Sequence, residues 1–60
     1  MFKVFVLLPE GDHWKVVETV VTVSKADAKT ESRRLRREHR GHRPFVCTYP
    51  AGEVPAFIPV

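Results

Sequence analysis

Two runs of β-branched and aromatic residues, 2–8 and 14–23, stand close together near the start of the chain. Such residues suit a pleated, partly buried surface, so each run predicts a β-strand. The residues between them, 9–13 (PEGDH), have the composition of a turn. Because two strands joined by a short loop pair antiparallel, the N-terminal part of the chain predicts a β-hairpin.

A helix is predicted directly after the second run. Ser24 is a favourable N-cap residue, and Asp27 three positions later resembles the acidic member of a capping box. Gly41 is a natural residue for the position after a helix end, and Pro44 cannot continue a helix. These start and stop signals predict a helix over residues 25–40.

A third, shorter strand is predicted over residues 45–49. The helix must carry the chain back across the sheet, which places this strand antiparallel beside the first one. We therefore expect an α+β fold with element order β-β-α-β, a three-stranded sheet in spatial order 2-1-3, and one helix packed on one face. Residues 1–49 are expected to form a single small domain, and residues 50–60, with three prolines, a Pro-rich extended tail.

Length and cysteine content limit the class of protein. The chain has 60 residues, and a domain of this size buries only about 60% of the surface that its unfolded form exposes. Cys47 is the only cysteine, so no internal disulfide can form. Small secreted domains usually depend on several disulfides, and a cytoplasmic protein is therefore expected. The apolar run at residues 2–8 is too short to cross a membrane, and no membrane association is expected.

The predicted helix has a narrow apolar stripe and a broad basic face. At about 100° per residue, the stripe contains Ala28, Ser32, Leu35 and His39. The net charge of the chain is +3, and the positive charge is concentrated on the other side of this helix. The residues of the basic face, with Arg43 just beyond the helix, are Lys29, Arg33, Arg36, Arg37, Arg40 and Arg43.

An arginine-rich face suits an acidic partner. Guanidinium groups present a planar fork of donors that matches phosphate and carboxylate oxygens two at a time. The same face could equally be a solvated surface, with Glu31 and Glu38 pairing part of the charge. Sequence-specific recognition of bases would need side chains in a groove or aromatic rings for stacking. The sequence has no RNP-type aromatic pattern, no GXXG loop and no zinc-finger spacing. Contact with a nucleic-acid backbone is therefore the expected mode.

The predicted sheet has two apolar faces but only one helix to cover them. Strict alternation along the strands puts Lys3 and Glu18 on the outer face. The apolar residues that alternation adds to this face are Phe5, Leu7, Trp14, Val16 and Val20. A sheet face with this much apolar surface is expected to be shielded from solvent by another part of the chain or by a partner. The tail could provide this shield through Val54, Phe57 and Ile58, a second copy could stack on the face as a homodimer, or a different protein could bind there.

The sequence gives no support for metal or catalytic chemistry. His39, His42 and Cys47 have a spacing that matches no zinc finger or ribbon, and His13 is remote, so no metal and no cofactor are expected. Cys47 on a strand would need an oriented base and a pocket to act as a nucleophile. We therefore expect no catalytic residues and a protein that is not an enzyme.

The sequence thus favours a small non-enzymatic binding module whose arginine face engages an acidic partner, with nucleic-acid backbone as the first candidate. The alternative is a protein-interaction module with an interface formed by Phe5, Leu7, Trp14, Val16, Val20, Phe57 and Ile58. The layout of hairpin, helix and closing strand resembles small phage-encoded proteins that bind and modulate host enzymes, and also certain small ribosome-associated domains. That resemblance implies a protein partner or a place as a small subunit of a larger assembly.

Overall fold

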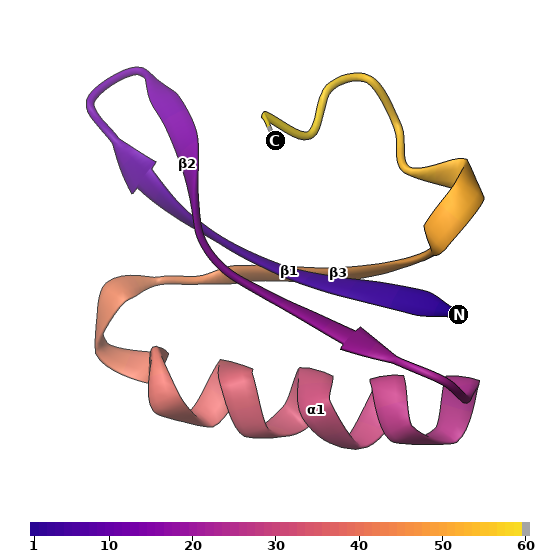
Figure 1. Ribbon diagram of the computed structural model, residues 1–60. Helices are drawn as coiled ribbons and strands as arrows, with labels where there is room; N and C mark the ends of the chain where they lie inside the picture. Colours follow the sequence, from indigo (N-terminus) through magenta and orange to yellow (C-terminus); the bar gives the residue numbers. More distant parts are fainter. Residues whose placement is uncertain (60) are drawn as a thin grey trace.

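A three-stranded sheet lies between one α-helix and a C-terminal segment that returns over the sheet. The computed structural model describes residues 1–59. Its strands are β1 (Phe2–Glu10), β2 (His13–Thr22) and β3 (Phe45–Pro50), and its α-helix is α1 (Lys25–Glu38). Figure 1 shows α1 on one side of the sheet and the C-terminal segment on the other. The strand order is β2-β1-β3 and both pairings are antiparallel, which confirms the predicted α+β fold.

A two-residue turn, Gly11 and Asp12, joins β1 to β2. Gly11 has a φ of 63°, a left-handed conformation that glycine adopts without steric cost. Glu10 pairs with His13, so the ends of the predicted turn belong to the strands. The hairpin is therefore confirmed, with a shorter loop than the turn composition indicated.

β2 has one residue more than β1 across the middle of the hairpin. Val6 is opposite Glu18, whereas Leu7 is opposite Val16, so Val17 is the extra residue of a β-bulge. Because side chains alternate between the faces with a period of two, one extra residue reverses the face of every residue beyond it. The faces that strict alternation predicts for β2 are therefore wrong for the residues after Val17.

The predicted position of Val20 on the outer face is wrong for this reason. Val20 packs against the buried cluster between the sheet and α1. Glu18, also expected on the outer face, pairs with side chains from the helix side. Val16, which precedes the bulge, does lie on the outer face with Leu7. Beyond the bulge, the outer face of β2 consequently carries Thr19 and Val21 in place of Glu18 and Val20.

The predicted start of the helix is confirmed, and its end comes two residues early. The Ser24 side chain accepts a hydrogen bond from the backbone N–H of Asp27 at 3.1 Å. α1 ends at Glu38, and a short 3-10 helix, η1 (Arg40–His42), follows. On the sheet side, α1 buries Ala28 and Leu35 against Val4 and Val6, which makes the first of two cores.

The C-terminal segment covers the other face and makes the second core. It begins with a 3-10 helix, η2 (Ala51–Glu53), whose first residue donates its backbone N–H to the carbonyl oxygen of Met1 at 2.9 Å. Ile58 is only 3% exposed and packs with Phe5 and Leu7. The C-terminal segment of the chain itself therefore shields part of the outer face, which was one of the three possibilities considered from the sequence. Residue 60, the last residue of the predicted tail, lies outside the described residues.

Candidate functional site

Four arginines line one hollow on the outside of the helical region. Arg33, Arg36 and Arg37 come from α1 and Arg40 from η1, and they border a shallow concavity of about 390 Å³, the arginine hollow. Positions i, i+3, i+4 and i+7 share one side of a helix, which explains the grouping. Arg40 keeps this alignment although the α-helix has already ended. All four residues are exposed.

The arginines of the hollow have no acidic partner in the described part of the chain. None of the four has a carboxylate oxygen within 4.0 Å among residues 1–59. Their guanidinium donors therefore face solvent. Four like charges held this close create a positive local field that favours an anion.

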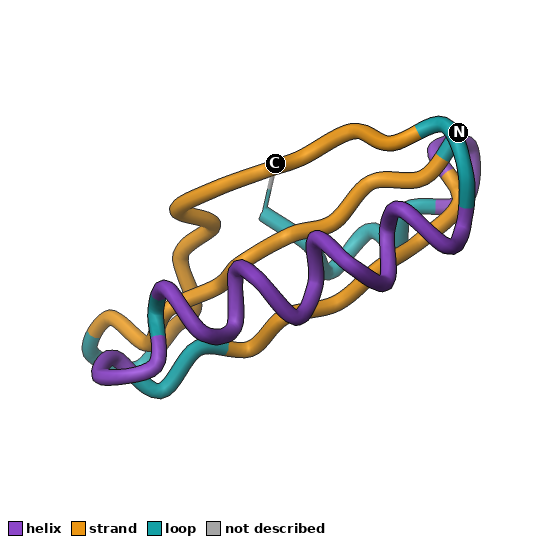
Figure 2. Tube along the Cα trace, turned by 90° about the horizontal axis from the view of Figure 1, so that it is seen from below, coloured by secondary structure: helices purple, strands orange, loops and turns teal. Residues whose placement is uncertain are grey.

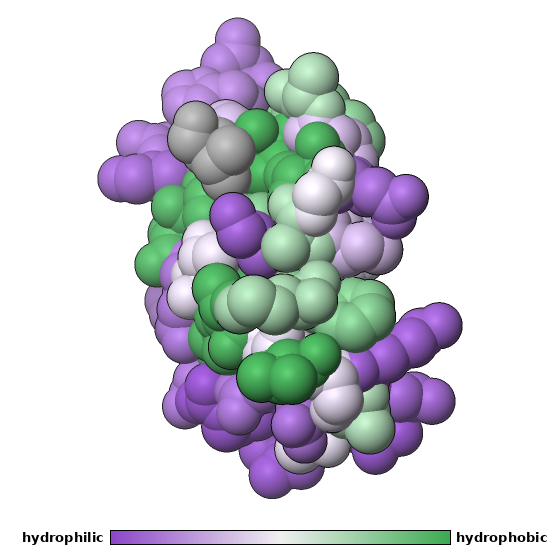
Figure 3. All heavy atoms as spheres, turned by 45° about the vertical axis from the view of Figure 1, so that its right-hand side comes forward, coloured by the Kyte–Doolittle hydropathy of each residue, from purple (hydrophilic) through white to green (hydrophobic). Residues whose placement is uncertain are grey.

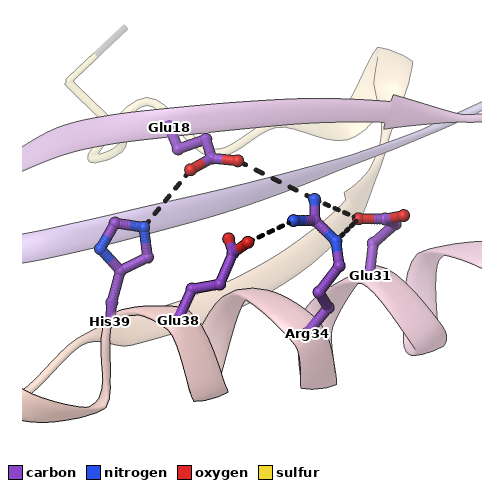
Figure 4. Close-up of polar contacts among 5 residues, drawn as sticks. All are labelled: Glu18, Glu31, Arg34, Glu38 and His39. Atoms are coloured by element: carbon purple, nitrogen blue, oxygen red, sulfur yellow. Dashed lines mark hydrogen bonds and ion pairs between the residues drawn. The ribbon is translucent and has the colours of Figure 1, made fainter.

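Arg34, between these residues in sequence, behaves differently (Figure 4). Its Nε donates to Oε2 of Glu31 at 2.7 Å, and its Nη1 donates to Oε1 of Glu38 at 2.8 Å. Its Nη2 lies 4.0 Å from Oε2 of Glu18, which β2 places on this side through the bulge. The hydrogen bond with Glu31 is the main reason why the pKa of Arg34 is raised. His39 completes the network, with its Nε2 3.3 Å from Oε1 of Glu18.

Charge is therefore segregated around α1. By helical spacing, positions 27, 31, 34 and 38 share one flank, which carries the acidic residues of the helix and faces Glu18 of β2. Positions 33, 36, 37 and 40 share the other side. Glu31 and Glu38 are paired with Arg34 on this flank of Asp27, Glu31, Arg34 and Glu38, so no carboxylate of α1 compensates the charge of the arginine hollow.

The two other basic residues predicted for binding lie outside the hollow. Lys29 lines a separate depression of about 240 Å³ together with Lys25, Ser32 and Thr48. Arg43 follows η1 in a left-handed conformation with φ of 55°, which is uncommon for a residue other than glycine. The structure thus brings together four of the six predicted residues in one site.

A second concavity lies on the opposite side of the sheet. It has a volume of about 320 Å³ and is lined by Leu7, Trp14, Phe45 and Phe57; we call it the aromatic groove. The rings of Trp14 and Phe45 lie 6.0 Å apart between centroids, inclined by 57°. Figure 3 shows one side of the molecule, where apolar residues gather across the middle between hydrophilic residues at the two ends. Sequence reasoning missed Phe45, which the register places opposite Leu7.

Three of the seven residues of the predicted protein interface are buried, and Val16 and Val20 are half buried. Phe5, Leu7 and Ile58 are buried beneath the C-terminal segment. Trp14 and Phe57 remain broadly exposed, at 48% and 70%. Of the predicted interface residues, those of the aromatic groove therefore remain the most accessible.

The sheet separates the aromatic residues from the arginine hollow. Trp14 lies in the aromatic groove, and Tyr49 lies near Phe5 on the same side, with a distance of 6.5 Å between ring centroids. The hollow is lined by exposed arginines of α1 and η1, and α1 lies on the other side of the sheet (Figure 1). A single nucleotide cannot place its phosphate in the hollow and stack its base on these rings. The aromatic rings of Trp14 and Tyr49 therefore do not belong to the same site as the arginine hollow.

One trio of potential metal ligands is formed that sequence spacing did not suggest. Donor atoms of Glu18, Glu38 and His39 lie within 4.8 Å of one another. These atoms already have partners, because Arg34 donates to Glu38 and the His39 ring is within hydrogen-bond distance of Glu18. The trio is therefore part of the hydrogen-bonding network around Arg34. The trio could not be predicted from the sequence, because Glu18 faces α1 only as a result of the β-bulge.

Cys47 is half buried under the C-terminal segment and is a free thiol. Burial raises its pKa, which favours the neutral thiol over the nucleophilic thiolate. The side chain of Tyr49 opposes this shift through a hydrogen bond. The environment of Cys47 is that of a packed apolar residue.

Comparison of the chain with family models, with curated proteins and with solved structures finds no match. Within residues 1–59, no helix is long and apolar enough to span a membrane. A function must therefore be inferred from the residues and their geometry.

Proposed function

We propose that this chain is a small non-enzymatic binding module whose arginine hollow binds the phosphate groups of a nucleic-acid backbone. The observation that carries the proposal is the contrast between neighbouring arginines. Arg34 takes up the nearby carboxylates, while the four arginines of the hollow share one concave surface and have no acidic partner among residues 1–59.

Phosphate is the ligand that suits this surface best. A guanidinium group can donate two parallel hydrogen bonds to phosphate oxygens, and four such groups can surround a run of phosphates. From Arg33 to Arg40 the helical rise spans about 10 Å, a length of duplex axis over which the two strands of DNA together carry about six phosphates, enough for each of the four guanidinium groups to meet one. A helix face that served only solubility could carry acidic residues among its arginines. The face that borders the arginine hollow carries none.

The proposed binding is independent of sequence. The rings that could stack bases lie across the sheet from the hollow. Affinity should then come from charge neutralisation and the release of counterions, which makes it strongly dependent on salt. Duplexes of different base composition should bind with similar affinity.

A titration of a fluorescent duplex by anisotropy, repeated at several salt concentrations, tests the proposal. Four phosphate contacts predict a slope of about −3.6 for the logarithm of affinity against the logarithm of salt, and a loss of affinity of about 100-fold between 50 and 200 mM. A slope near zero would exclude backbone binding by the arginine hollow.

Matched charge variants locate the site. The double variant Arg36→Gln/Arg37→Gln removes two charges from the hollow, and Lys3→Gln/Lys15→Gln removes two charges from the sheet. Both variants have the same net charge. We expect the first to weaken binding by one to two orders of magnitude and to flatten the salt slope by about 1.8, and the second to have a much smaller effect. Equal effects would indicate attraction by net charge without a site.

The aromatic groove supports a second candidate function, a protein-interaction module. Two of its four lining residues, Trp14 and Phe45, are about half exposed, and Phe57 is more so. Exposed aromatic residues around a hollow are the usual anchors of protein interfaces. For this function, Trp14→Ala should abolish association with a protein partner and leave duplex binding intact, whereas variants of the arginine hollow should do the reverse.

A further inference from the structure

β2 forms an edge of the sheet, and its second half is left uncovered. The strand pairs with β1 on one side and has no strand on the other in the described part of the chain. Figure 2 shows β2 along one margin of the sheet, with most of α1 in front of the other two strands. The C-terminal segment packs on Val16 and on residues of β1 and β3, away from residues 19–23.

This uncovered half is rich in exposed β-branched residues. Val21 is 50% exposed and Val23, just after the strand, is 80% exposed, and Thr19 is exposed as well. We call Thr19, Val21 and Val23 the valine edge. An edge strand offers unpaired N–H and C=O groups, and proteins usually protect such edges with lysine, proline or a bulge. β2 has Lys15 and the bulge at Val17 in its first half, but residues 19–23 (TVVTV) contain no such residue.

The valine edge is also electrically neutral. Glu18, the only charged residue between positions 16 and 23, points to the helix side, where it pairs with Arg34 and His39. Thr22 is buried and donates its hydroxyl to the carbonyl oxygen of Ser24 at 3.1 Å. Lys3 of β1 is opposite Val21 but lies one strand further in, so no charged side chain on residues 19–23 of β2 opposes a strand that approaches this edge.

We propose that the valine edge pairs with the valine edge of a second copy of this chain, antiparallel about a two-fold axis, to form a continuous six-stranded sheet. A two-fold pairing brings β-branched residues opposite β-branched residues, a favourable cross-strand combination, and brings no like charges together. The other edge of the sheet is a poorer candidate, because β3 is only six residues long and ends at Pro50.

This pairing has a geometric consequence for the arginine hollow. A two-fold axis that relates antiparallel edge strands is perpendicular to the sheet, so both copies of α1 lie on the same face. Both hollows then point to one side of the dimer. In so far as the proposed function holds, one duplex could contact two hollows at once, and dimerisation would raise affinity through multivalency.

Sedimentation equilibrium of the full chain in the absence of nucleic acid tests the dimer on its own. We expect the wild-type chain to have twice the mass of the 6.9 kDa monomer at micromolar concentrations and above. Val21→Lys, and independently Thr19→Lys, should give a folded monomer, because each places a charge on the edge without touching a core. Phe57→Lys adds the same charge at the aromatic groove and should remain dimeric.

Amide hydrogen exchange supplies the second measurement. Alternate N–H groups in residues 19–23, those that point away from β1, should exchange slowly in the wild type and fast in Val21→Lys. A wild-type chain that stays monomeric at millimolar concentration would overturn the proposal. So would a dimer that Phe57→Lys dissociates and Val21→Lys does not, since that dimer would use the aromatic groove. Neither result bears on duplex binding by a monomer, which the salt titration measures separately.

Discussion

Arg34 and Glu31 form the closest ion pair between helix residues: Nη2 of the guanidinium lies 2.6 Å from Oε2 of the carboxylate, and Nε donates to the same oxygen at 2.7 Å. Arg33, the preceding residue, has no acidic partner among residues 1–59 and borders the arginine hollow. Two consecutive arginines thus have different surroundings because a helix turns by about 100° per residue. Their variants should differ accordingly.

Arg34→Gln should lower the melting temperature, and the difference from wild type should shrink in 1 M salt, because salt screens exposed ion pairs. Its duplex affinity should stay close to that of the wild type. Arg33→Gln should leave the melting temperature unchanged, weaken duplex binding several-fold, and flatten the salt slope by about 0.9. Thermal unfolding and anisotropy on both proteins make the comparison. If both variants lost affinity equally, the distinction between the two arginines would be wrong.

The N-cap of α1 offers a test of how the helix is held. Ser24→Ala removes the acceptor for the backbone N–H of Asp27 and should reduce the free energy of unfolding by about 1 kcal/mol. Ser24→Asp keeps an acceptor at the same position and should retain most of the stability. Urea unfolding followed by circular dichroism measures both. An alanine variant as stable as the aspartate variant would show that the cap contributes nothing.

Local sequence signals were sufficient for most of the fold. The turn composition around Gly11, the cap at Ser24 and the β-branched runs each act within a few residues, and the strand order follows from connecting those elements compactly. The grouping of the arginines also follows from a local period. It continues to Arg40 because η1 winds on in the same direction after α1 ends.

The parts that sequence reasoning missed depend on pairing between distant strands. The bulge at Val17 is visible only when β1 and β2 are placed in register, and that one residue moves Val20 and Glu18 to the helix side. Phe45 reaches the aromatic groove because β3 pairs with β1 in a particular register. No periodicity within one strand contains this information.

The burial of Ile58 leads to a prediction about the C-terminal segment. Ile58→Ala should reduce the free energy of unfolding by about 2–4 kcal/mol, because it leaves a cavity against Phe5 and Leu7. Phe57→Ala, one residue earlier and exposed, should change it by less than about 0.5 kcal/mol. If the alanine variant of Ile58 does not fold, Ile58→Val should still show a loss of about 1 kcal/mol. Equal losses at both positions would mean that the segment does not pack on the sheet.

The Cys47 thiol should make the folded state sensitive to alkaline pH. Burial raises its pKa above the ordinary value of 9.0, so the folded state holds the thiol proton more tightly than the unfolded state does. A group whose pKa is raised by folding stabilises the protein fully below its unfolded pKa. This contribution is lost as pH rises from about 9 through the higher folded pKa. Tyr49 acts in the same direction from its ordinary value of 10.0, since desolvation raises its pKa too.

The absorbance of the thiolate near 240 nm gives a direct measurement. In the folded wild type, its midpoint should lie at a higher pH than in the same chain in concentrated urea. Because the ionised Tyr49 side chain also absorbs in this region, the same titration of Cys47→Ala is subtracted to isolate the thiolate signal. The same variant should lose less stability than the wild type between pH 8 and pH 9.5, where Tyr49 contributes little because its ordinary pKa is higher. A folded midpoint at or below the unfolded one would contradict the packing of Cys47 beneath the C-terminal segment, because an exposed thiol has no reason to retain its proton.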